Sequence, residues 1–141
     1  MFGATYILPF RPSRKIKICP APFHKEIGAP HAVDFSMPEG TSVLAARAGV
    51  VIDCESHYGR NYTDKRFTGR CNFSEIRHED GETSLYAHLK RRSLKVKKGD
   101  RVTAGQVIAL SGQTGYATYP HLHFGVYDAK SVNVKICWAR K

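Results

Sequence analysis

The chain has 141 residues, of which 42% are hydrophobic and 24% are charged, a composition typical of a globular protein that can bury a core. Its 22 lysines and arginines outnumber 12 acidic residues, and the resulting net charge of +10 favours polyanionic surroundings such as nucleic acid, anionic lipid or a bacterial wall. No stretch approaches the roughly 18 consecutive apolar residues that would span a bilayer. We expect a single domain over residues 1–141.

The N-terminal segment MFGATYILPFRPSRK places its charges after a very short apolar run, and Pro9 interrupts that run. A secretory signal peptide has basic residues first and a longer apolar stretch after them. No signal peptide is therefore predicted in this segment.

Short runs of apolar or alternating residues follow, at the length of strands rather than of helices. Turn sequences such as MPEG, EDGE, KKGD and SGQTG separate several of them. The pattern predicts an all-β fold, a small antiparallel sandwich or barrel. The runs cover residues 16–19, 31–35, 41–46, 49–54, 72–78, 83–89, 101–110, 122–128 and 132–138.

Two segments resemble each other, EGTSVLAARAGVV (39–51) and KGDRVTAGQVIAL (98–110). Both contain a glycine, then a valine and an alanine at the same spacing, and we expect them to pack as the two halves of a small β-roll. Biotinyl and lipoyl carrier domains show a similar repeat, with a lysine at a tight hairpin between the halves. Here YAHLKRR and a long loop separate the two segments, which argues against a carrier domain.

A long, basic loop is predicted at residues 55–70, either functional or a solvated hairpin tip. Cys54 and Cys71 flank it, and a disulfide between them would clamp its base. Cys19 and Cys137 lie in the similar contexts IKIC and VKIC, and a bridge between them would join the first and last strands. Free thiols are the alternative, and the absence of a C-x-x-C pair argues against a zinc knuckle.

His121 and His123 lie two residues apart in a predicted strand, so their side chains share a face. Asp34 lies among apolar strand residues, where an unpaired charge would be costly. A metal would satisfy this carboxylate, as would an arginine partner or a turn cap. A catalytic zinc takes three nitrogen, sulfur or carboxylate ligands and leaves a fourth position to water.

Four segments together resemble the lysostaphin/LytM-type zinc metallopeptidases, which include murein endopeptidases and staphylolytic enzymes. In chain order they read AVDFSMPEGTSVLAARAGVV, IRHEDGETSLYAHL, VKKGDRVTAGQVIALSGQTG and YPHLHFGV. The resemblance covers about residues 20–128, and it implies a small antiparallel β-roll with a catalytic groove. It also implies Zn²⁺ as cofactor, Asp34 and His123 as metal ligands, and His88 and His121 as catalytic histidines that do not bind the metal.

The first metal ligand departs from the family's compact H-x-x-x-D spacing. His31 precedes Asp34 by three residues, and a regular strand would point the two side chains to opposite faces unless a bulge intervened. A second branch of the family has its first ligand further upstream, and PFHKEIGAPHAVDFSMPEGT resembles that branch. This favours His24 as the first ligand, with His31 as the alternative.

The resemblance further implies hydrolysis of the peptide cross-links of bacterial peptidoglycan, in the periplasm or outside the cell. Its style of strand favours D-Ala–diaminopimelate cross-links, with polyglycine bridges as the other family substrate. No motif supports nucleic-acid binding despite the charge. The alternative is an inactive family member that binds peptidoglycan or activates an amidase, although every metal and catalytic position can be filled here.

Two further histidines and one tyrosine are predicted to lie outside the metal-binding and catalytic set. We expect His78 to be structural and His57, in the basic loop, to be exposed to solvent. Tyr86 lies two residues before His88 and is predicted to share its face, where it either packs or shapes the cleft.

Overall fold

The structure is a computed structural model that describes residues 5–59, 61–62, 71–117 and 119–140. Within these ranges the chain forms short strands and one 3₁₀ turn, η1 (Pro22–Lys25), and no helix is long and apolar enough to cross a membrane. The strands are β1 (Lys17–Cys19), β2 (Val33–Ser36), β3 (Ser42–Leu44), β4 (Gly49–Glu55), β5 (Asn61–Tyr62), β6 (Asn72–Arg77), β7 (Thr83–Leu89), β8 (Arg101–Val102), β9 (Val107–Leu110), β10 (Gly115–Tyr116), β11 (His121–Tyr127) and β12 (Asn133–Val134).

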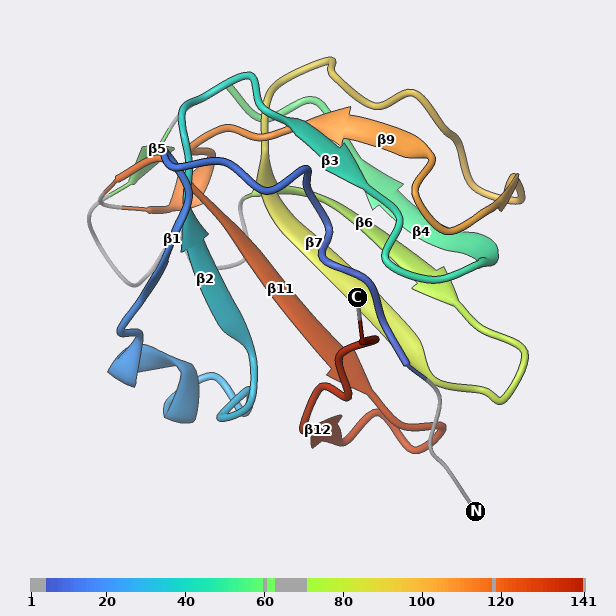
Figure 1. The fold of residues 1–141 in the computed structure, drawn as a ribbon. Coiled ribbons are helices and arrows are strands. Elements are labelled where there is room, and N and C mark those ends of the chain that lie inside the picture. Colours follow the sequence, from blue (N-terminus) through green and yellow to red (C-terminus); the bar gives the residue numbers. More distant parts are fainter. Residues whose placement is uncertain (1–4, 60, 63–70, 118, 141) are drawn as a thin grey trace.

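One large sheet organises the molecule (Figure 1). Its strands follow the order β1-β2-β11-β7-β6-β4-β8, with β12 also paired to β11, and all of these pairs are antiparallel. Two short pairs complete the fold, β3 with β9 and the parallel pair β5 with β10. The predicted all-β, antiparallel architecture is confirmed.

The two similar segments do pack against each other. β3 of the first pairs with β9 of the second, and β4 of the first pairs with β8 of the second. The predicted strand over residues 101–110 is interrupted, because a turn closes with Gln106 N–H donating to the Thr103 carbonyl. Gly105 supplies the positive φ of 88° that this turn requires.

The large sheet has one covered face and one face that carries polar groups. Phe35, Ile76, Leu122 and Phe124 are buried on the covered face, at most 2% exposed. The β3–β9 pair and the two terminal segments lie over this face (Figure 1), so the hydrophobic core lies between them and the large sheet. Because neighbouring residues of a strand point to opposite faces, the histidines and aspartate that alternate with this core lie on the other face.

The terminal segments are tied to each other rather than to the first strand of the sheet. Tyr6 forms an isolated parallel bridge with Trp138, through hydrogen bonds of 2.8–2.9 Å to its neighbours Cys137 and Ala139. The strand predicted over residues 132–138 is shorter in the structure, where only β12 (Asn133–Val134) pairs with β11. All four cysteines are free, so neither of the two candidate disulfides is present.

Candidate metal centre

Sheet register places Asp34 directly opposite His123. The two residues are Cα partners in the antiparallel pair of β2 and β11, so their side chains leave the sheet on the same face. His121 lies two residues before His123 and is the partner of Ser36 on β2, which keeps it on that face as well. Three of the predicted site residues thus come from two neighbouring strands.

His24 reaches the same point from η1, the turn between β1 and β2. Pro22 begins this turn, and the Ala29 N–H donates to the His24 carbonyl at 2.8 Å, which folds the following loop back over it. His24 Nδ1 lies 3.0 Å from the Ala32 carbonyl, so it carries the ring proton and Nε2 is the free nitrogen. This contact fixes the ring's orientation.

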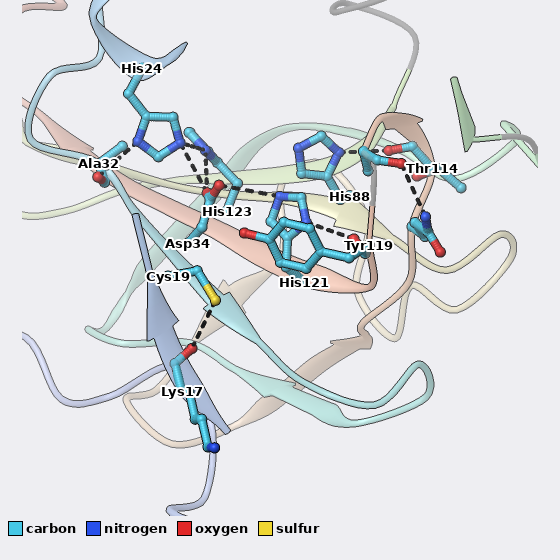
Figure 2. Close-up of polar contacts among 12 residues, drawn as sticks. Lys17, Cys19, His24, Ala32, Asp34, His88, Thr114, Tyr119, His121 and His123 are labelled. Atoms are coloured by element: carbon cyan, nitrogen blue, oxygen red, sulfur yellow. Dashed lines mark hydrogen bonds and ion pairs between the residues drawn. The ribbon is translucent and has the colours of Figure 1, made fainter. Parts of the chain in front are cut away.

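The three side chains form one compact, buried group (Figure 2). Asp34 Oδ1 lies 3.0 Å from His24 Nε2 and 3.1 Å from His123 Nδ1, and the two ring nitrogens are 3.2 Å apart. All three residues are at most 7% exposed. One possible ligand atom from each lies within 4.8 Å of those from the other two, a donor set of nitrogen and carboxylate oxygen suited to zinc.

His31 is not part of this group. Its backbone N–H donates to Asn133 Oδ1 at 2.7 Å, which ties the loop before β2 to β12. Because His24, and not His31, lies within reach of both Asp34 and His123, the geometry favours His24 over the alternative ligand.

His121 lies beside the three-residue group without joining it. Its Nδ1 donates to the Tyr119 carbonyl at 2.9 Å, and its Nε2 is 3.5 Å from Asp34 Oδ2. The Tyr119 ring packs against the imidazole, with ring centroids 4.7 Å apart. These contacts hold the free Nε2 toward the metal centre (Figure 2).

His88 reaches the site through an irregularity in β7. Ala87 pairs with Phe73 and Leu89 with Asn72, so His88 is an extra residue on its strand, and its φ is +66°. This conformation is uncommon for a residue with a side chain and is found where a bulge redirects one. His88 Nδ1 donates to the Thr114 carbonyl at 2.6 Å, and its ring lies 4.5 Å from that of His121.

The bulge also corrects the prediction for Tyr86. A regular strand would place Tyr86 and His88 on one face, but Tyr86 is fully buried in the core, with its ring 5.2 Å from that of Phe124. Its packing role is confirmed, and its predicted place on the face of His88 is wrong because the extra residue reverses the alternation between them. His57 is exposed, as expected, and its ring contacts Glu55.

A cavity of about 400 Å³ opens over these groups. His24, Asp34, His88, His121 and His123 all line it. Most of the remaining lining is apolar and comes from η1 with its flanking residues, from β7 and from the segment before β11: Pro20, Ala21, Pro22, Phe23, Ile27, Leu85, Ala87 and Ala117. Cys71, Tyr119 and Tyr127 complete it. The candidate centre is therefore buried on its own sheet yet accessible to a ligand from one side.

The pKa shifts of the site differ between Asp34, in the three-residue group, and the two flanking histidines, His88 and His121. Although burial opposes ionisation, hydrogen bonds with His123 and His24 hold the pKa of Asp34 far below its ordinary value. Burial and the neighbouring imidazoles lower the pKa of His88 to about 3. Burial also lowers the pKa of His121, against the attraction of Asp34. At neutral pH Asp34 is thus a carboxylate, and the imidazoles of His88 and His121 are neutral, with Nε2 atoms that can accept hydrogen bonds.

The antiparallel β fold, the His–Asp–His group and the two further histidines in one cavity agree with the resemblance to lysostaphin-type metallopeptidases. Comparison with known families agrees, because residues 29–134 match the model of peptidase family M23. The chain belongs to this family.

The similarity extends to characterised relatives and to solved structures. The chain is 38% identical over 104 residues to the peptidoglycan DD-endopeptidase ShyA of Vibrio cholerae, and 38% identical over 106 residues to lysostaphin of Staphylococcus simulans. These matches cover 73% and 74% of the chain but only 21% and 19% of the two relatives, so the chain spans about a fifth of their length.

Two solved structures share the fold at substantial identity. A zinc-containing peptidase from Vibrio cholerae matches 92% of the chain and 38% of its own, with a TM-score of 0.64 and 31% identity. The catalytic domain of lysostaphin from Staphylococcus simulans matches 94% of the chain and 86% of its own, with a TM-score of 0.57 and 28% identity.

Proposed function

We propose that this protein is a zinc-dependent endopeptidase that hydrolyses the peptide cross-links of bacterial peptidoglycan. The observation that carries the proposal is the buried group of His24, Asp34 and His123, which opens into a cavity beside two neutral histidines. Residues 1–141 would act as one peptidase domain, working in the periplasm or outside the cell as expected for enzymes of the bacterial wall.

The residues present fit zinc in number, chemistry and spacing. Bonds of about 2.0–2.2 Å arranged as a tetrahedron place donor atoms about 3.3–3.6 Å apart. The donors of His24, Asp34 and His123 are already 3.0–3.2 Å apart, and only a small outward movement separates them from that geometry. The carbonyl that orients His24 is the kind of outer partner that metal-binding histidines have.

Zinc bound here would supply a water whose pKa is lowered toward about 7 and would polarise the scissile carbonyl. The chain itself supplies the proton acceptors, since His88 and His121 each keep Nε2 unprotonated while Nδ1 donates to a backbone carbonyl. An imidazole that has taken the water's proton becomes a hydrogen-bond donor, able to stabilise the oxyanion and then to protonate the leaving amine. The aromatic ring of Tyr119 and the positive φ of His88 keep the two rings in place.

Cross-links between D-Ala and diaminopimelate are the favoured substrate, with polyglycine bridges as the other candidate. ShyA is a peptidoglycan DD-endopeptidase, while a further relative with 37% identity over 106 residues is the glycyl-glycine endopeptidase ALE-1 of Staphylococcus capitis. The cavity wall of Pro22, Phe23, Ile27 and Leu85 supports the first substrate, because an apolar wall gains more from contact with a side-chain methyl than with glycine.

Parallel digestion tests both the activity and the bond. Zinc-loaded and chelator-treated protein would be incubated with peptidoglycan cross-linked through D-Ala–diaminopimelate and with peptidoglycan cross-linked through pentaglycine. We expect cleavage of the first only, and only by the zinc-loaded protein. Cleavage that survives complete zinc removal would contradict the metal mechanism, and preferential cleavage of pentaglycine would contradict the assigned bond.

A further inference from the structure

A second cavity, of about 290 Å³, lies at the end of β7 beyond His88. It is lined by Gly59, Lys90, Arg91, Gly112, Gln113 and Thr114. Glu39 also lines it, so the cavity gathers two cations against one anion. Among the residues that the structure describes, no ion pair involves Lys90 or Arg91.

Asn72, a fully buried residue, holds the walls of this cavity together. Its side chain accepts a hydrogen bond from the Tyr58 N–H at 2.9 Å and donates to the carbonyls of Tyr58 and Leu89 at 2.7 and 3.2 Å. Its backbone N–H donates to Thr114 Oγ1 at 3.1 Å. Asn72 thus joins three segments of the cavity wall, through its side chain to Tyr58 and Leu89 and through its backbone to Thr114.

Two glycines let the backbone approach Lys90 and Arg91 closely. A Cβ at Gly112 would lie 2.7 Å from the backbone nitrogen of Lys90, closer than real contacts allow. A Cβ at Gly59 would lie 3.1 Å from Cδ of Arg91. The chain therefore packs against the backbone of Lys90 and against the side-chain stem of Arg91, at positions that larger residues would obstruct.

This cavity is coupled to the candidate active site through Thr114. Its carbonyl accepts the 2.6 Å hydrogen bond that orients His88, and its hydroxyl donates to the Leu89 carbonyl at 2.8 Å, next to Lys90. A ligand held by Lys90 and Arg91 would thus lie in the cavity that Thr114 also lines. Thr114 in turn positions the catalytic His88, as Figure 2 shows.

We propose that this second cavity binds a carboxylate of the peptidoglycan stem peptide through Lys90 and Arg91, and so orients the stem whose cross-link is cut. The inference rests on the proposed function. Ammonium and guanidinium groups form charge-assisted hydrogen bonds with carboxylates, and stem peptides carry free carboxylates beside their cross-links. The nearby Glu39 leaves a net charge of +1 in the cavity, which matches one carboxylate better than a highly charged phosphate polymer.

Equilibrium binding tests this inference without requiring turnover. The ligands are a stem peptide without a cross-link and the same peptide with its carboxylates converted to carboxamides, each titrated calorimetrically against the full chain. The cavity variant is Lys90→Met with Arg91→Met. The matched control, Lys95→Met with Lys98→Met, removes two exposed charges that do not line the cavity.

We expect the unmodified protein and the control to bind the carboxylate peptide about tenfold more tightly than the carboxamide peptide, and the cavity variant to lose that preference. Equal loss in the control, or a preference retained by the cavity variant, would overturn the inference. So would peptidoglycan cleavage without any preference for the carboxylate peptide, or tighter capture of a phosphate-rich wall polymer that is lost in the cavity variant. Failure of the proposed function would appear separately, as carboxylate preference in a protein that cleaves no cross-link.

Discussion

Two buried groups of polar side chains contain histidines, and their hydrogen bonding differs in kind. In the candidate metal centre, nitrogen and oxygen atoms of His24, Asp34 and His123 converge on one point, with three mutual separations of 3.0–3.2 Å. Around His78 the contacts form a linear chain instead. His78 Nδ1 donates to the Ala48 carbonyl at 2.7 Å, and Nε2 lies 2.9 Å from Ser84 Oγ.

The chain around His78 continues until every group has its own partner. The hydroxyls of Ser84 and Tyr86 are 2.9 Å apart, and the Tyr86 hydroxyl accepts a hydrogen bond from the Ala46 N–H at 2.8 Å. Such a network satisfies buried donors and acceptors one by one and joins the sheet to the segment before β4. Convergence of several lone pairs at a cavity, by contrast, indicates a cation site, because no proton arrangement satisfies all of them equally well. The position of a histidine on a strand therefore does not distinguish a metal ligand from a structural residue, whereas the convergence of several lone pairs on one point does.

The largest expected effect comes from removing the carboxylate at the point of convergence. Asp34→Ala should lose bound zinc and all measurable cleavage, since only two protein ligands remain. Zinc content by elemental analysis and peptidoglycan digestion are the measurements. The matched His78→Ala variant should keep stoichiometric zinc. Full zinc content in Asp34→Ala would remove this residue from the ligand set.

Substitution of the flanking histidines should separate chemistry from metal binding. His88→Ala and His121→Ala should each lower kcat by about 10²–10⁴-fold, the usual contribution of a positioned acid or base, while zinc stays bound. Steady-state kinetics and zinc analysis on the same samples check this. Zinc loss in His121→Ala would show that this ring is a ligand rather than a proton acceptor.

At the other network the expected effect is on stability. His78→Ala removes the buried donor to the Ala48 carbonyl and one of the two partners of the Ser84 hydroxyl, and should lower the free energy of unfolding by about 2 kcal/mol. Chemical denaturation measures that change. Cleavage at a temperature where the variant is folded should stay near the unmodified level, and a loss of activity without a loss of stability would contradict the structural role.

Acidification should destabilise the zinc-free protein. Burial lowers the pKa of His78 and His121 and brings that of His88 to about 3, so the folded state favours their neutral forms. Their contribution to stability is complete above about pH 6.5, the ordinary value, and is lost as the pH falls toward the folded values. His24 acts oppositely, because Asp34 raises its pKa despite burial. Thermal unfolding from about pH 7.5 to about pH 5 should show a falling midpoint, and a rising one would contradict this balance.

The smallest expected effect concerns the thiols. Since Cys19, Cys54, Cys71 and Cys137 are free, reducing agent should leave the thermal midpoint unchanged. Cys137→Ser, at an exposed position, should change the free energy of unfolding by less than about 0.5 kcal/mol. Thermal melts with and without reductant check both, and a midpoint that drops on reduction would indicate a disulfide.

Much of this arrangement follows from local pattern. Alternation in β2 and β11 determines that Asp34 and His123 point away from Phe35 and Leu122, and the spacing of turns determines short antiparallel strands. The meeting of Asp34 with His123 depends on strand register, which the resemblance to a family implied and which alternation by itself does not specify.

Other features depend on contacts distant in sequence. His88 reaches the cavity through a bulge opposite Asn72 and Phe73. A strand that alternated regularly over TSLYAHL would place its side chain on the wrong face. The role of Asn72 in joining Tyr58, Leu89 and Thr114 has no local signal, because its partners lie 14 to 42 residues away. A signal for the second cavity was present in KRR directly after YAHL, yet only the folded chain places those cations beside Thr114.

The central claim is that the convergent group holds a zinc ion used to cut peptidoglycan cross-links. Its most direct test is incubation of zinc-loaded protein with purified cross-linked peptidoglycan, with the released fragments identified by mass spectrometry beside a His121→Ala control. We predict that cross-linked dimers fall to monomers only with the unmodified protein, at masses that identify D-Ala–diaminopimelate cleavage. Intact dimers, together with a protein that takes up no zinc when zinc is supplied, would contradict the claim and favour a wall-binding family member without catalysis.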